Sequence, residues 1–117
     1  MSDTFGIARS GVTAAGIDLA VSANNVANAQ TDGFVPSRAE MVEQPEGGVS
    51  VQVQKEPEPP KDPLAEVRAD RALLAPSRTD LVQEMVSQSR AAAVYRANLA
   101  SLRTAEELEL EVTKLKG

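Results

Sequence analysis

Apolar and small residues recur every three or four positions near the start of the chain. The series is Phe5, Ala8, Val12, Ala15, Leu19, Ser22 and Val26. Alternating spacings of three and four place side chains on one face of an α-helix. The pattern predicts an amphipathic helix from about residue 4 to residue 28, whose start Ser2 or Asp3 can cap.

Three glycines interrupt this predicted helix, at Gly6, Gly11 and Gly16. Each weakens a helix by up to about 1 kcal/mol relative to Ala. Because they lack side chains, another backbone can come close, so we expect partners to hold the helix. We expect Asn25 and Asn28 to end it by hydrogen bonding to free backbone groups near its C-terminus.

A second and longer series lies at the other end of the chain. It comprises Leu81, Met85, Gln88, Ala92, Tyr95, Leu99, Leu102, Ala105, Leu108, Val112 and Leu115. Asp80 followed by Gln83 resembles a capping box. The pattern predicts a helix about 50 Å long. A chain of 117 residues has little globule to cover it, so its apolar stripe needs the first helix, neighbouring subunits or both.

The segment between the two helices alternates apolar and polar residues over Val49-Ser50-Val51-Gln52-Val53-Gln54, which is typical of a strand. A turn precedes it at 45–48, so 39–43 can form the opposing strand of a hairpin. A Pro-rich acidic stretch at 56–63 should be extended. The predicted fold is mainly α. Its two long terminal helices pair as a coiled coil, with a short β-hairpin and an extended loop between them.

The composition excludes several kinds of catalytic and binding chemistry. The chain has no Cys and no His, which removes thiol nucleophiles, imidazole bases and the commonest transition-metal ligands. Its formal net charge of −5 argues against a nucleic-acid partner. No apolar run reaches the roughly 20 residues that span a bilayer, and the start lacks the pattern of a cleavable signal. The glycine spacing matches no phosphate-binding loop. We therefore expect no catalytic residue, no cofactor and no metal site.

Two ordered motifs resemble the flagellar basal-body rod and hook proteins. Near the start the resemblance is carried by Ser10, Gly11, Asn24, Asn25, Asn28, Thr31, Gly33 and Phe34, within an Asn-Asn-Val-Ala-Asn-Ala-Gln-Thr-Asp-Gly-Phe run. Near the end it is carried by Asp-Leu-Val-Gln-Glu-Met-Val at 80–86, and by the later steps Tyr-Arg-Ala-Asn and Thr-Ala-Glu-Glu-Leu. The short length and the Gly-Gly-Val-Ser-Val strand are similar to the proximal rod type. The stretch 62–76 departs from it.

The resemblance implies a structural subunit that polymerises through its terminal helices, transmits torque and lines the export channel. It implies export without a cleavable signal into the periplasmic rod, by the flagellar type III apparatus. The implied partners are other copies and sister rod proteins. Assembly would use an N-terminal region (1–33) and a C-terminal helix (79–117) on either side of a 34–78 insertion. The expected interface residues are Val12, Ala15, Leu19, Val26, Leu81, Met85, Ala92, Tyr95, Leu99 and Leu102.

Two other interpretations stay open from the sequence. A soluble coiled-coil adaptor or export-related chaperone explains both helical patterns and the acidity, but it does not explain the long Asn-rich run. A distal rod or hook subunit that has lost its middle domain explains both motifs.

Overall fold

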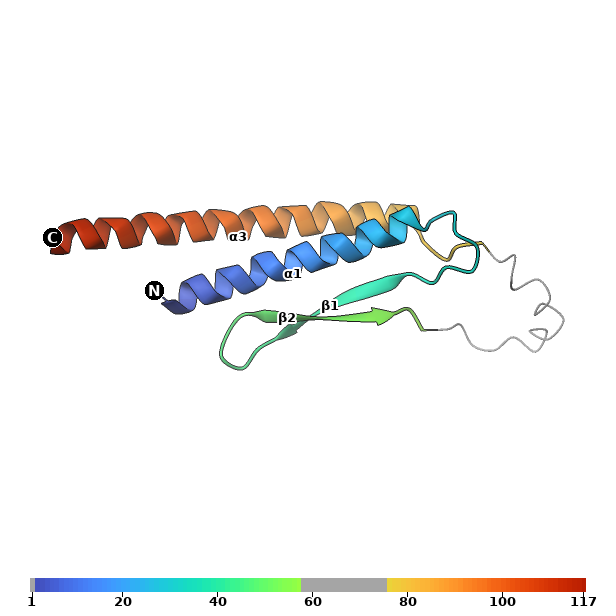
Figure 1. Ribbon diagram of the computed structural model, residues 1–117, viewed down its shortest axis with the longest axis horizontal. Coiled ribbons are helices and arrows are strands. Elements are labelled where there is room, and N and C mark those ends of the chain that lie inside the picture. Colours follow the sequence, from blue (N-terminus) through green and yellow to red (C-terminus); the bar gives the residue numbers. More distant parts are fainter. Residues whose placement is uncertain (1, 58–75) are drawn as a thin grey trace.

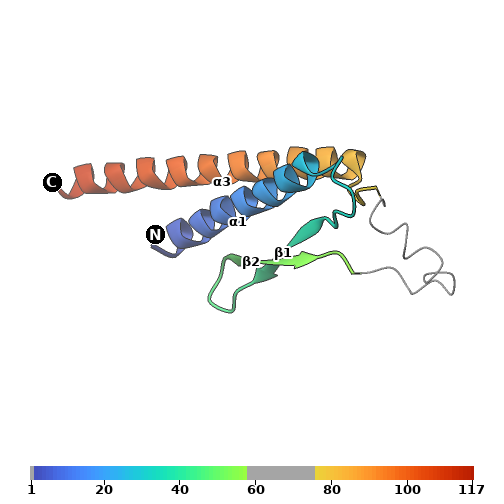
Figure 2. The ribbon, with the colours of Figure 1, turned by 45° about the vertical axis from the view of Figure 1, so that its right-hand side comes forward.

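The computed structural model describes residues 2–57 and 76–117. Helix α1 (Ser2–Ala27) is followed by strands β1 (Ser37–Glu43) and β2 (Val49–Lys55) and by helix α3 (Leu81–Lys116). The two helices lie side by side and run in opposite directions, with the hairpin along the other side of α1 (Figure 1). The turned view keeps the same order of α3, α1 and hairpin (Figure 2). The predicted fold class, mainly α with two long helices and a short hairpin between them, is confirmed.

The contact between α1 and α3 is made mainly by small side chains. The buried apolar residues are Ala8, Ala14, Ala15, Ala91 and Ala105. At Gly11 the helices come so close that an added Cβ would lie 2.5 Å from Oδ1 of Asn98. The helix pair is therefore thin. The larger apolar side chains of the two predicted series lie mostly outside the contact, because close backbone approach leaves no room for them.

The starts of the two helices agree only in part with the predicted capping signals. Asp80 caps the first turn, where its carboxylate accepts hydrogen bonds from the backbone N–H groups of Val82 (3.0 Å) and Gln83 (3.2 Å). The reciprocal half of the predicted capping box is absent, because the Gln83 side chain turns to the hairpin instead. At the start of the chain, α1 already includes Ser2 and Asp3, so neither precedes the helix as a cap.

The hairpin pairs Ser37 with Lys55 at one end and Glu43 with Val49 at the other. Its turn contains Gly47 and Gly48, both with positive φ (94° and 86°), a backbone conformation that side chains disfavour. An isolated two-stranded hairpin is marginal in water. This one is attached to α1, because the backbone N–H of Val49 donates to Ser10 Oγ at 3.1 Å.

Most of the predicted Pro-rich stretch at 56–63 lies outside the described residues, as does nearly all of 62–76. Among the helices that the structure describes, none is long and apolar enough to cross a membrane.

Candidate functional site

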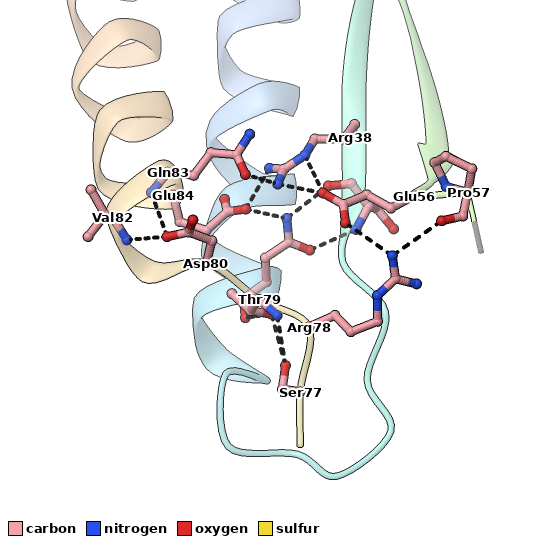
Figure 3. A network of polar contacts seen from close by, with 12 residues as sticks. Arg38, Glu56, Pro57, Ser77, Arg78, Thr79, Asp80, Val82, Gln83 and Glu84 are labelled. Carbon is pink, nitrogen blue, oxygen red and sulfur yellow. Dashed lines mark hydrogen bonds and ion pairs between the residues drawn. The ribbon is translucent and has the colours of Figure 1, made fainter. Parts of the chain in front are cut away.

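A buried polar junction joins the C-terminal end of α1, the hairpin and the first turn of α3 (Figure 3). Glu84 on α3 is at its centre and is fully buried. Its Oε1 accepts hydrogen bonds from Nη1 of Arg38 at 2.6 Å and from Nδ2 of Asn25 at 3.1 Å. Thus one carboxylate oxygen connects β1, α1 and α3.

Arg38 extends this junction across the hairpin. Its Nε donates to Oε1 of Glu56 at 2.9 Å, just beyond β2, and its Nη2 donates to Oε1 of Gln83 at 2.7 Å. Burial alone would lower the pKa of Arg38, but the hydrogen bonds to Glu84 and Glu56 outweigh burial and raise this pKa. The guanidinium stays charged, which suits charge-assisted bonds to two carboxylates.

Asn25 joins α1 to the start of β1. Its Nδ2 donates to the backbone oxygen of Ser37 at 2.8 Å, and its Oδ1 accepts from the backbone N–H of Ser37 at 2.9 Å. Its backbone oxygen also accepts from the Thr79 hydroxyl at 3.1 Å. The prediction that Asn25 bonds free groups at the helix end was therefore wrong for its side chain. A strand and a second helix lie within its reach, and both offer partners.

Asn28 behaves as predicted. It lies one residue past α1, and its Nδ2 donates to the backbone oxygen of Asn24 at 3.0 Å. The Thr31 hydroxyl in turn donates to Asn28 Oδ1 at 3.1 Å. These bonds satisfy polar groups at the helix terminus, where intrahelical partners run out.

The other residues of the N-terminal motif also lie at joints of the fold. Ser10 accepts a hydrogen bond from the backbone N–H of Val49 at the start of β2. The lack of a side chain at Gly11 leaves room for Asn98 of α3. Gly33 has a positive φ of 73° in the turn after α1. The backbone oxygen of Phe34 accepts from the N–H of Arg78 at 3.0 Å, so this turn lies against the segment that leads into α3. The motif thus places the three elements relative to one another.

The predicted interface residues occupy very different environments. Ala15 is buried, and Val12, Ala92 and Leu102 are half-buried. The other six are exposed: Leu19 (40 %), Val26 (37 %), Leu81 (51 %), Met85 (66 %), Tyr95 (38 %) and Leu99 (38 %). The larger members of the set therefore form an apolar surface of the subunit rather than its core.

The sequence interpretation missed the role of Glu84, Arg38 and Thr79. A signal for Glu84 was present, because it is the one acidic residue within the apolar run 81–86. Nothing in the sequence indicated that Arg38 would face it, since the two lie 46 residues apart. Among the described residues no group of three acidic side chains could hold a metal ion. The described residues therefore form a polar junction that connects the elements, and exposed apolar faces on the two helices.

Comparison with known families supports this view of the N-terminal segment. Residues 5–34 match a family described as flagella basal body rod protein. The N-terminal segment of this chain is similar to that family. All eight predicted signature residues lie within the match, from Ser10 to Phe34. The flagellar basal body rod family is structural and is not an enzyme family, and it assembles with other basal-body components. No curated protein matches the chain.

Proposed function

We propose that this protein is a structural subunit of the flagellar basal-body rod that assembles through the exposed apolar faces of its two terminal helices. The observation that carries the proposal is the contrast between a small alanine-rich contact inside the subunit and large apolar side chains outside it. Burying one such side chain contributes about 1.5–3 kcal/mol. Neighbouring subunits that cover these faces would therefore bury the large apolar side chains that are exposed in the single subunit.

The glycines of α1 support the same proposal. An added Cβ at Gly6 or Gly16 would meet nothing within 4 Å, whereas one at Gly11 would collide with Asn98. Gly6 and Gly16 thus weaken the helix without serving any contact within the described subunit. They are well suited to the close approach of a helix from a neighbouring subunit.

The polar junction supports a mechanical role. Glu84, Arg38 and Asn25 fix the hairpin against both helices, so force applied to one element is passed to the others. We propose that the assembled subunits transmit torque and line the channel of the periplasmic rod, and that the chain reaches it through the flagellar export apparatus. Its partners are other copies and sister rod proteins. Its position is in the proximal rod, and 1–33 and 79–117 are the assembling regions.

The test replaces one exposed apolar residue by a charge. Met85→Asp should leave the subunit folded, because the side chain is 66 % exposed, but it should prevent assembly, because the charge would be buried between subunits. The variant is expressed in a strain that lacks the protein. Swimming in soft agar and the content of isolated basal bodies are then measured. Gln54→Asp, on an exposed polar position of β2, is the control and should swim normally. Normal motility of the Met85 variant would exclude this face from assembly.

A further inference from the structure

The last turns of α3 extend beyond α1, as Figures 1 and 2 show. The two helices are in a fixed register, because Asn25 lies opposite Glu84 and Gly11 lies opposite Asn98. Continued along both helices, the same register puts Ser2 level with Glu107. Residues 108–116, here called the tail, therefore have no described helix beside them, and every residue after Ala105 is exposed.

The stripe of α3 that faces α1 has a seven-residue period. Glu84, Ala91 and Ala105 are its buried members, and Asn98 is the residue that meets Gly11. The next position in this period is Val112, which is 45 % exposed. The neighbouring stripe positions in the tail are Leu108 (49 % exposed) and Leu115 (87 % exposed). The packing stripe therefore continues as an apolar stripe beyond the part of α3 that faces the described α1.

The residue types on this stripe favour one kind of partner. In heptad terms Val112 occupies an a position, with Leu108 and Leu115 at d positions. A β-branched residue at a with Leu at d favours a parallel two-stranded coiled coil. The acidic residues beside the stripe also favour a parallel arrangement. Glu111 at a g position would face Lys116 at an e position of a parallel partner, whereas antiparallel pairing would bring Glu111 near its own copy.

We propose that the tails of two copies of this chain pair in parallel, with Val112 packed against Val112 of the second copy. The pairing is confined to the tail, because α1 occupies the same stripe further back, and the two subunits diverge from there. So few residues give a weak dimer, with a dissociation constant on the order of 0.1–1 mM. The inference concerns copies of this chain alone and does not depend on the proposed rod function.

The absence of native cysteine makes a disulfide test clean. Val112→Cys is compared with Leu110→Cys, which lies in the same turn but off the stripe and is 56 % exposed. Under mild oxidation at about 1 mM chain, Val112→Cys should form linked dimers at least about tenfold faster than Leu110→Cys. Leu108→Cys and Leu115→Cys should also link to themselves, which only a parallel, in-register pair allows.

A second measurement needs no cross-link. Val112→Glu should lower the association constant seen by sedimentation equilibrium at least about tenfold, because two carboxylates would meet at the contact. Leu110→Glu should leave this constant within about twofold. Circular dichroism checks that both variants keep the helices. Equal oxidation rates at 110 and 112, or a strictly monomeric chain at 1 mM, would each overturn the proposal.

Discussion

The junction and the outer helix faces of this subunit reverse the usual distribution of polar and apolar residues. At the junction, the carboxylate of Glu84 on α3 is fully buried and bonded to two other elements, α1 and β1. On the outer faces, Leu81, Met85 and Val86 are more than half exposed. Directional hydrogen bonds fix the geometry inside the subunit, while non-directional apolar surface remains free for association. The comparison teaches that polar contacts fix the arrangement of the elements within the subunit, whereas its large apolar side chains lie on its surface.

The largest expected effect on stability comes from removing the buried carboxylate at the junction. Glu84→Ala leaves Arg38 and Asn25 without their shared acceptor and should lower the free energy of unfolding by about 3 kcal/mol. Urea unfolding followed by circular dichroism measures it. Glu106→Ala, on an exposed position of the same helix, is the control and should change stability by less than about 0.5 kcal/mol. Equal stability of the two variants would show that the junction does not hold the elements together.

Replacing two glycines of α1 by Ala should change the stability by intermediate amounts, with opposite signs at the two positions. Gly11→Ala should destabilise the subunit by about 1–3 kcal/mol, because the new methyl group overlaps the Asn98 amide. Gly16→Ala should stabilise it by up to about 1 kcal/mol, because the position is open and Ala favours helix.

Thermal or urea unfolding measures both variants, and motility of the complemented strain measures assembly. If Gly16 admits a neighbouring helix, its Ala variant should be more stable and yet less motile. A variant that is both more stable and fully motile would remove Gly16 from the proposed interface.

The smallest effect concerns pH. Burial raises the pKa of Asp18 above its ordinary value of 3.8, with Glu84 adding to the rise and Arg90 opposing it. A carboxyl whose pKa is raised on folding favours the folded state below its ordinary pKa and loses this contribution as the pH rises through the folded value. Asp18→Asn should therefore stabilise the subunit at pH 7, by less than the glycine effects, and the difference should vanish near pH 3. Unfolding free energies at both pH values test this sign, and a difference that grows on acidification would contradict it.

Much of the fold was predictable because its signals are local. The two long series of spacing three and four predicted α1 and α3, and the alternation at 49–54 predicted β2. Asp80 and Asn28 were correctly placed at helix ends, since each bonds groups within four residues. The N-terminal motif indicated the rod family, which the match over 5–34 supports.

The role of Asn25 could not be predicted in the same way. Its residue type favours a helix end, but its partners are Ser37 and Glu84, which lie 12 and 59 residues away. Likewise, the period of the α3 series did not reveal which of its faces meets α1. Small residues on the stripe of Ala91 and Ala105 let the helices approach more closely than the faces with larger side chains would allow.

By itself, the sequence determined the number of main elements, their order, where the helices end and the family resemblance of the N-terminal segment, because period, capping and motif are properties of neighbouring residues. Only the tertiary structure decided that Glu84, Arg38 and Asn25 share one buried site and that most of the large apolar residues face outward. These outcomes depend on the register and closeness of two helices far apart in the chain. That register is set where Gly11 meets Asn98 and Asn25 meets Glu84.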